Sequence, residues 1–206
     1  MEPKIIETKK SKLSGNIRVV KSLGLGKYIQ VEGLTQSGGV VKDIWRFSLS
    51  RAQKLVLSLN KVLILGLGGG SIAKLVAKTW PEAEITGVEI DEVMIELGEK
   101  HLGLKDANVK TVIEDAEAFV AQSREKYDLI LVDTYVGYNF PKKFEEETFL
   151  KAVNKLLTPE GIAVFNRLYF DEYRGMAMRF GKKLEKVFSS VVYIYPEANI
   201  MFLCKR

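Results

Sequence analysis

The alternation of apolar and amphipathic segments from Val62 onward constrains the fold of this chain more than any other feature. Five apolar runs of strand length are separated by four stretches with helical periodicity. Strands that are joined by crossover helices form parallel sheets, so this order predicts an α/β fold. The expected strands lie at about residues 62–65, 84–88, 109–113, 127–132 and 161–166. The expected helices lie at about residues 70–79, 92–101, 116–123 and 145–157.

The C-terminal segment is expected to close the sheet with an antiparallel hairpin. A helix near residues 172–187 precedes two β-prone runs, Val191 to Tyr195 and Ile200 to Cys204. The segment Pro196 to Asn199 between these runs has the composition of a turn. The chain therefore predicts a mostly parallel seven-stranded sheet with one antiparallel strand, which differs from a six-stranded nicotinamide-binding domain.

Residues 1–46 are expected to form a small N-terminal β element. Short β-prone runs are separated by glycines, which predicts small antiparallel hairpins. These runs are Asn16 to Val20, Lys27 to Glu32 and Val40 to Trp45. A helix from Phe47 to Leu59 is expected to lead into the main domain, residues 47–206.

Composition and charge fit a globular enzyme and point to no macromolecular partner. Hydrophobic residues make up 47% of the 206-residue chain, but no apolar run approaches the roughly 20 residues of a membrane helix. Residues 1–12 are polar and lack the features of a secretory signal, so we expect a cytoplasmic protein. The net charge is +5, yet basic residues are interspersed with acidic ones, and nucleic-acid binding is not indicated.

The single histidine and the single cysteine, residue types that often act in catalysis or metal binding, are expected to have structural roles. His101, the only histidine, ends an expected helix without a cysteine cluster or a second histidine, so we expect no metal. Cys204, the only cysteine, lies in an apolar run and is expected to be a buried strand residue.

A glycine-rich turn follows the first strand of the expected parallel sheet. The turn consists of Gly66, Leu67, Gly68, Gly69 and Gly70. Glycine lets the backbone approach a ligand closely, because a Cβ atom there would clash. The G-x-G-x-x-G pattern of dinucleotide folds fails at Ser71, so the turn alone does not identify the ligand.

Carboxylates stand at the ends of the next three strands. Glu89 ends the second strand, where it could accept both hydroxyls of a ribose, or instead belong to an acidic helix cap within residues 89–92. Asp115 follows the third strand, where it could accept an adenine amino proton and also cap the helix that begins at Ala116. Asp133 ends the fourth strand, opposite the glycine turn, where the chain reverses its winding. Together these groups predict one adenosine-shaped binding site.

Four motifs between Val62 and Asn166, which read GLGGGS, VEID, EDA and LILVDTY, resemble the spermidine and spermine synthase family and its methyltransferase relatives. The segment from Gly26 to Trp45 resembles the N-terminal hairpin of the same synthases. The resemblance implies a Rossmann-like class I methyltransferase fold, a homodimer and a small-molecule acceptor. It also implies that S-adenosylmethionine, or its decarboxylated form, is the co-substrate.

The resemblance further implies a role for each site residue. The glycine turn would lie against the donor, Glu89 would bind the ribose, and Asp115, beside Ala116, would bind the adenine. Gln36 would lie near the sulfur end of the donor, and Asp133 would be the catalytic aspartate. The candidates on the acceptor side are Trp45, Thr134, Tyr135 and Asn166. Tyr135, Tyr138 and Phe140 could wall the acceptor pocket or simply pack beneath a lid.

The acceptor half departs from the family pattern. The donor-binding aspartate of the synthase glycine loop falls on Gly69, and the second acid of their catalytic loop falls on Val136. Their acceptor-binding tyrosine falls on Trp45, and an acidic pair falls on Val41–Lys42. An acceptor polyamine is a polycation, which the pair Lys142–Lys143 would repel.

These departures favour transfer of a methyl group from intact S-adenosylmethionine to an unknown acceptor. Two alternatives remain open: aminopropyl transfer from the decarboxylated donor to an amine, and a nucleoside-binding module that has lost its chemistry. In methyl transfer and in aminopropyl transfer alike, Asp133 would orient or deprotonate the acceptor.

Overall fold

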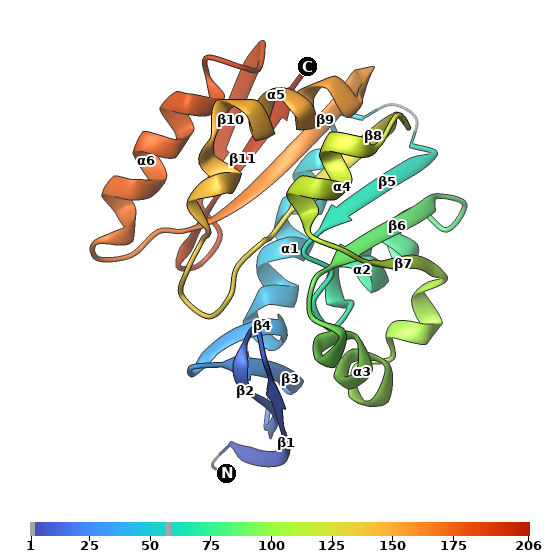
Figure 1. Cartoon of the computed structure of the whole chain (residues 1–206), viewed down its shortest axis with the longest axis vertical. Helices are drawn as coiled ribbons and strands as arrows, with labels where there is room; N and C mark the ends of the chain where they lie inside the picture. The colour runs from blue at the N-terminus through green and yellow to red at the C-terminus, as the bar shows by residue number, and fades with distance from the viewer. Residues whose placement is uncertain (1–2, 57–58) are drawn as a thin grey trace.

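The computed structural model describes residues 3–56 and 59–206, which form two sheets joined by one helix (Figure 1). The N-terminal sheet is antiparallel, and its four strands lie in chain order. They are β1 (Lys4–Ser11), β2 (Gly15–Ser22), β3 (Gly26–Val31) and β4 (Leu34–Gly38). The expected N-terminal β element is present, and it includes two strands, β1 and β4, that the sequence pattern did not predict.

Helix α1 (Gly39–Ala52) connects the two sheets and corrects two predictions. The segment Val40 to Trp45, predicted to be a strand, belongs to α1. The helix predicted to start at Phe47 therefore starts earlier, and it ends at Ala52. Its predicted continuation to Leu59 includes residues 57–58, which lie outside the described residues.

The early start of α1 has a local cause in two adjacent glycines. Gly38 and Gly39 have φ angles of 79° and 47°, which favour glycine and turn the chain from β4 directly into the helix. The boundary predicted between residues 46 and 47 therefore falls inside α1.

The large sheet has seven strands in the order β10-β11-β9-β8-β5-β6-β7. They are β5 (Lys61–Leu65), β6 (Glu84–Glu89), β7 (Val109–Ile113), β8 (Tyr127–Val132), β9 (Leu157–Leu168), β10 (Ser190–Ile194) and β11 (Asn199–Lys205). Strands β5 to β9 are parallel, and β11 pairs antiparallel with both β9 and β10. The mostly parallel seven-stranded sheet and its C-terminal antiparallel hairpin are confirmed.

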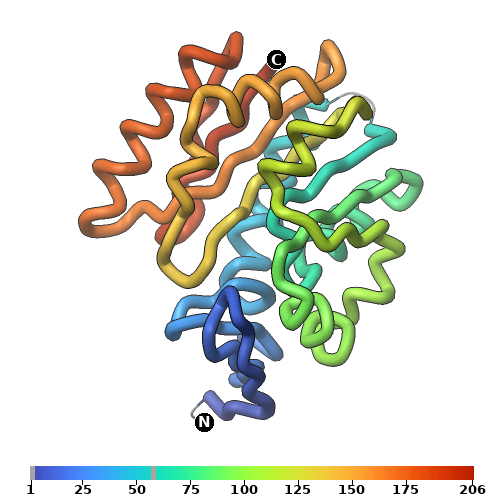
Figure 2. The backbone as a smooth tube through the Cα atoms, in the orientation of Figure 1, coloured from blue at the N-terminus to red at the C-terminus, as the bar shows by residue number. Residues whose placement is uncertain are grey.

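Helices cover both faces of the large sheet. They are α2 (Ser71–Thr79), α3 (Glu92–His101), α4 (Ala116–Gln122), α5 (Glu147–Leu156) and α6 (Tyr173–Leu184), with the 3₁₀ helices η1 (Leu104–Ala107) and η2 (Lys142–Glu145). Figures 1 and 2 show α4, α5 and α6 on the viewer's side of the sheet, with α1 and α2 behind it. Strand side chains alternate between these layers, so Leu63 and Leu65 pack with α4 to α6, whereas Val62 and Ile64 pack with α1 and α2.

The N-terminal sheet packs against α3 beside the carboxyl edge of the large sheet. Ile17 and Ile29 form an apolar cluster with Met94 and Leu97 of α3. Next to this cluster, Ser14 in the β1–β2 turn donates a hydrogen bond to the side chain of Asp91, just beyond the end of β6 (2.6 Å). The small sheet therefore borders the edge at which α/β folds bind ligands.

Three further features bear on the sequence predictions. Cys204 is buried in β11, as predicted. His101 ends α3, as predicted, and its Nε2 atom contacts the carboxylate of Glu7 in β1. In residues 3–56 and 59–206, no helix is long and apolar enough to cross a membrane.

Candidate active site

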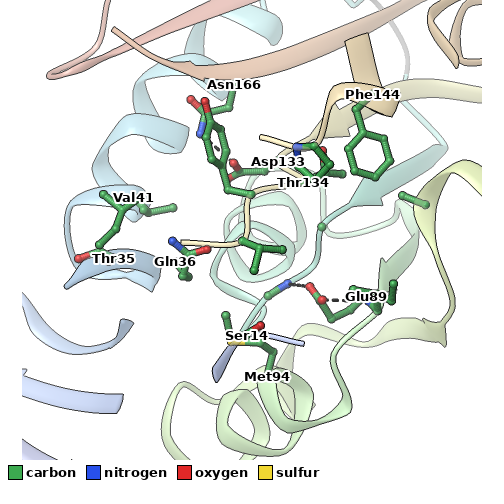
Figure 3. Close-up of a pocket in the computed structure, with 18 of the residues that line it drawn as sticks. Ser14, Thr35, Gln36, Val41, Glu89, Met94, Asp133, Thr134, Phe144 and Asn166 are labelled. Atoms are coloured by element: carbon green, nitrogen blue, oxygen red, sulfur yellow. Dashed lines mark hydrogen bonds between the residues drawn. The ribbon is translucent and has the colours of Figure 1, made fainter. Parts of the chain in front are cut away.

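A cavity of about 400 Å³ lies at the carboxyl edge of the large sheet, between the two sheets. Most of the predicted site residues line it, and Figure 3 shows several of them. The lining residues from the prediction are Gln36, Gly66, Gly68, Glu89, Asp115, Ala116, Asp133, Thr134, Tyr135 and Asn166. The other three predicted residues, Gly69, Gly70 and Trp45, pack behind this lining.

The glycine turn brings the ends of β5 and β8 together. Gly66 has a φ angle of 87°, and a Cβ atom at this position would overlap the carbonyl oxygen of Asp133. The strand end is fixed by a hydrogen bond from the Asp133 N–H to the Leu65 carbonyl oxygen (2.8 Å). Gly69 has a structural role, because a Cβ atom there would come within 2.7 Å of Ile29 and 2.8 Å of Leu102.

Glu89 lies at the end of β6 with its carboxylate held by backbone donors. Gly68 N–H donates to Oε2 at 2.7 Å, while the N–H groups of Ile90 and Asp91 donate to Oε1 at 2.9 and 3.0 Å. Burial raises the pKa of Glu89 despite these three hydrogen bonds. Each carboxylate oxygen retains acceptor capacity, so the group can still accept hydroxyl donors from a ligand.

The cap of α3 is Asp91, which belongs to the acidic segment from Glu89 to Glu92 that was considered as a helix cap. The Asp91 side chain accepts a hydrogen bond from Val93 N–H at 3.0 Å. Its second oxygen accepts hydrogen bonds from the hydroxyls of Ser11 and Ser14, at 2.5 and 2.6 Å. This connection, which brings Ser14 into the cavity lining, was not predicted because the serines lie about 80 residues away in the sequence.

Asp115 combines a helix cap with an ion pair. Its Oδ1 accepts hydrogen bonds from Glu117 and Ala118 N–H, at 3.0 and 3.3 Å, which confirms the predicted cap of α4. Its Oδ2 contacts the ammonium group of Lys143 in η2. Burial raises the pKa of Asp115, but the hydrogen bonds from Lys143 and the backbone outweigh burial and lower it overall.

The position of Lys143 corrects its predicted role. The sequence placed this lysine at the acceptor entrance as a charge that repels polyamines. In the structure it pairs with Asp115 and lies 3.8 Å from Glu117, so acidic side chains offset its charge. Phe144, next to it in η2, supplies an apolar wall on the same side of the cavity.

Asp133 stands at the end of β8 with one hydrogen-bond donor on each oxygen. Trp45 Nε1 donates to Oδ2 at 2.7 Å, and Asn166 Nδ2 donates to Oδ1 at 2.8 Å. The Oδ1 atom of Asn166 in turn accepts a hydrogen bond from Asn199 Nδ2 at 2.7 Å, which fixes the orientation of the Asn166 amide. The carboxylate is therefore held by α1 on one side and by β9 and β11 on the other.

Burial dominates the protonation of Asp133. It raises the pKa of Asp133 from 3.8 to about 6, although the hydrogen bonds from Asn166 and Trp45 oppose the increase. The group is thus mostly ionised at neutral pH and can accept a proton or a hydrogen bond there. Sequence reasoning placed Trp45 against the acceptor, but in the structure this side chain is fully buried and positions Asp133.

The structure decides between the two alternatives for the aromatic side chains after Asp133. Tyr135 lines the cavity, and its hydroxyl oxygen accepts a hydrogen bond from Leu168 N–H at 2.9 Å, while burial raises the pKa of Tyr135 to about 12. Tyr138 is exposed and Phe140 packs in the core, so neither lines the cavity. Thr134 is buried in the cavity lining, and its hydroxyl has no hydrogen-bond partner among the described residues.

The arrangement can hold a nucleoside on one side and a nucleophile on the other. Glu89 and Asp115 lie on the β6–β7 side of the cavity, whereas Asp133 with Thr134 and Asn166 lies on the β8–β9 side (Figure 3). Within residues 3–56 and 59–206, no cluster of three or more histidine, cysteine or acidic side chains has the geometry to hold a metal ion.

Comparison with known sequences assigns this chain to a protein family. The sequence model of the spermine/spermidine synthase domain matches residues 43–202. A probable polyamine aminopropyl transferase from Bifidobacterium longum is 32% identical over 145 residues, which cover 70% of this chain and 32% of that protein. The chain spans 22–37% of the length of the first curated relatives that it matches.

Solved structures share the fold of this chain. A probable spermidine synthase from Corynebacterium glutamicum has a TM-score of 0.81 at 20% identity, and the match covers 98% of this chain and 80% of that one. Human methyltransferase-like protein 13, solved in complex with SAH, has a TM-score of 0.66 at 28% identity and 81% coverage of each chain. The predicted Rossmann-like class I methyltransferase fold is confirmed, and because the family's sequence model matches most of the chain, the protein belongs to the spermine/spermidine synthase family.

Proposed function

We propose that this chain is a transferase that moves the aminopropyl group of decarboxylated S-adenosylmethionine to an amine held at Asp133. The observation that carries this proposal is the charge of the cavity. Its lining contains the carboxylates of Glu89, Glu114, Asp115 and Asp133, and the described lining has one cationic side chain, Lys143, which is paired with Asp115. Four carboxylates and one ammonium leave a formal charge of −3.

This charge favours the decarboxylated donor over intact S-adenosylmethionine. The decarboxylated compound has a sulfonium and an ammonium group and no carboxylate, so a negatively charged cavity attracts it more strongly. The carboxylate of intact S-adenosylmethionine would find no unpaired cation among the described lining residues. The sequence favoured methyl transfer, but family membership and cavity charge together favour aminopropyl transfer, its stated alternative.

The donor half of the proposed complex uses the residues predicted for it. Glu89 accepts the ribose hydroxyls, and Asp115 and Ala116 contact the adenine. Ile90 and Phe144 supply apolar side chains to the same lining. The glycine turn permits close approach of the nucleoside because Gly66 and Gly68 carry no side chain. Gln36, whose Nε2 donates to the Gly137 carbonyl oxygen at 3.3 Å, lies at the sulfur end.

Reaction at Asp133 requires a neutral amine. An alkylamine has a pKa of about 10.4 and is protonated in water at neutral pH, so it must lose a proton before it attacks. The ionised carboxylate of Asp133 accepts this proton or orients the N–H bonds. The nitrogen lone pair then attacks the methylene carbon beside the sulfonium, the C–N bond forms, the C–S bond breaks, and sulfur keeps the bonding electrons. The products are methylthioadenosine and the extended amine.

A product assay tests the proposal directly. The protein is incubated with the decarboxylated donor and a panel of primary amines, and the release of methylthioadenosine is measured. The Asp133→Asn variant is the control, because it removes the ionisable carboxylate while keeping the shape of the side chain. Release that depends on an amine and on Asp133 supports the proposal, whereas no release by a protein that binds the donor contradicts it.

Methyl transfer is the second candidate, and a specific observation favours it. The donor-binding aspartate of the synthase glycine loop is replaced by Gly69 in this chain, and human methyltransferase-like protein 13 is 28% identical over most of it. The same assay with intact S-adenosylmethionine distinguishes the two reactions, because methyl transfer releases S-adenosylhomocysteine. A protein that binds either donor but releases neither product would be a nucleoside-binding module.

A further inference from the structure

We infer that the acceptor is a primary amine with a single positive charge and an apolar chain. The inference rests on the proposed function insofar as the acceptor is an amine that reaches Asp133. It goes further by naming the chemistry of the rest of the acceptor, which differs from the polyamines in the names of the relatives.

The acceptor half of the cavity differs sharply from the donor half in the character of its lining. The carboxylates of Glu89, Glu114 and Asp115 and the ammonium of Lys143 all belong to the β6–β7 side or to η2. On the other side of Asp133, the wall comes from β4, α1, the loop after β8, and the ends of β9 and β11. Figure 3 shows Thr35 and Val41 on this acceptor side, across Asp133 from Glu89.

Asp133 is the only carboxylate in the described lining of the acceptor half. The apolar side chains of this wall are Leu34, Val40, Val41, Ile44, Val136 and Leu168. Ile44 and Leu168 are buried. An acceptor that extends away from Asp133 therefore contacts aliphatic side chains, and the described lining of this half offers it no second carboxylate.

The reacting end of the acceptor has its partners beside Asp133. The Thr134 hydroxyl is adjacent in the chain, buried, and without a partner among the described residues. Each oxygen of Asp133 accepts one hydrogen bond from the protein and retains capacity for another. One ammonium or amine nitrogen can therefore donate to the carboxylate of Asp133.

A second ammonium group would lack such partners. Transferring a charged group to an apolar wall without a paired anion is costly, whereas transferring a methylene chain is favourable. The cavity thus favours an alkylamine over a diamine of the same length. This conclusion does not depend on which alkyl group the donor supplies, because the amine enters in the same way in both reactions.

The test compares pentylamine with 1,4-diaminobutane, which have the same number of non-hydrogen atoms and differ by a terminal methyl group in place of an ammonium group. Both amines are assayed with the decarboxylated donor and with S-adenosylmethionine. We expect kcat/KM to be about 10- to 100-fold higher for pentylamine, the range set by the loss of one charge-assisted hydrogen bond.

A charge introduced into the wall should reverse the preference. Val41 lies in the first turn of α1, which has no acidic residue, so Val41→Asp adds a carboxylate where the helix dipole favours it. We expect this variant to raise kcat/KM for 1,4-diaminobutane by about tenfold or more and to lower it for pentylamine. Val41→Asn, of nearly equal shape and without charge, should leave the order of the two amines unchanged. Val136→Asp, in the loop after β8, repeats the test from a second element of the wall.

The outcomes separate this inference from the proposed reaction. Methylthioadenosine release with 1,4-diaminobutane equal to or faster than with pentylamine overturns the inference and leaves aminopropyl transfer intact. S-adenosylhomocysteine release with pentylamine preferred overturns aminopropyl transfer and supports the inference. Absence of both products with every amine overturns both.

Discussion

Replacement of Asp133 by asparagine should stabilise the protein relative to the wild type as the pH rises from 4.5 to 7.5, while abolishing its activity. The carboxylate is buried at the end of β8, and burial raises its pKa from 3.8 to about 6. The folded state therefore binds a proton more tightly at this site than the unfolded state does. As the pH rises through the interval from 3.8 to about 6, the folded state loses stability, because it must then hold a buried charge.

The size of this loss of stability follows from the change in the pKa of Asp133. A pKa raised from 3.8 to about 6 corresponds to a stability loss of about 3 kcal/mol, since each pKa unit is worth about 1.4 kcal/mol. About 2 kcal/mol of this loss falls between pH 4.5 and 7.5, because part of the titration is already complete at the lower limit. Asp133→Asn removes the titration but also changes hydrogen bonds to Trp45 and Asn166. That second effect shifts the free energy of unfolding by the same amount at every pH.

Urea denaturation of the wild type and of Asp133→Asn between pH 4.5 and 7.5 measures how the difference in their free energies of unfolding depends on pH. The free energy of unfolding of Asp133→Asn minus that of the wild type should increase with pH by about 2 kcal/mol and level off above about pH 7. All other titrating groups are shared and cancel in this difference. A difference that stays constant across this range would refute the argument that Asp133 titrates with a raised pKa, whatever the variant does to activity.

Three further changes test the remaining parts of the site. Glu89→Ala should weaken binding of either donor by roughly 1.5–3 kcal/mol in calorimetry, the value for lost hydrogen bonds to a charged group; unchanged affinity in a folded variant would remove Glu89 from the site. Trp45→Phe deletes the Nε1 donor that lowers the pKa of Asp133, so the rising limb of the rate–pH profile should move to higher pH, and an unmoved limb would count against this role. Gly66→Ala should destabilise the protein by about 2 kcal/mol or more in urea titrations, because its Cβ overlaps the Asp133 carbonyl oxygen. Gly24→Ala is its control, since Gly24 has a similar φ angle of 88° and no atom within 4 Å, and equal losses would contradict the overlap argument.

Most of the parallel sheet was predictable from the sequence because four of its strands, β5 to β8, are short segments of five or six residues that alternate with helices. These strands lie where they were predicted, and their carboxyl ends carry the glycine turn, Glu89 and Asp133. One rule, that ligands bind at the carboxyl ends of parallel strands, was therefore enough to select the principal site residues.

The start of α1 was not predictable from residue composition in the same way. Val40 to Trp45 contains β-branched residues, which favour strands, but Ile44, Trp45 and Ser48 face the core with helical spacing. Tertiary packing therefore overrides local propensity at this segment. Two glycines with positive φ angles precede or start the helix, and glycines of this conformation also occur in hairpin turns. These glycines therefore did not distinguish the start of a helix from a turn between two strands.

The site contacts that were missed join segments far apart in the sequence. Lys143 reaches Asp115 from 28 residues away, and Asn199 reaches Asn166 from 33 residues away. From the sequence, Lys143 was expected at the acceptor entrance and Asn199 in a turn. Only the three-dimensional structure shows that the first offsets the charge of a carboxylate and that the second orients an amide.

The structure also changes what Gly69 implies about the donor. In sequence, a glycine in place of the synthase aspartate favoured intact S-adenosylmethionine, because a carboxylate that selects against it was missing. The backbone at Gly69, however, directs a Cβ atom toward Ile29 and Leu102, in the apolar cluster between α3 and the N-terminal sheet. A Cβ atom at this position would meet those apolar neighbours, so an aspartate requires Ile29 or Leu102 to shift. The donor preference that we propose therefore rests on the carboxylates that line the cavity, whose excess over Lys143 favours the donor without a carboxylate.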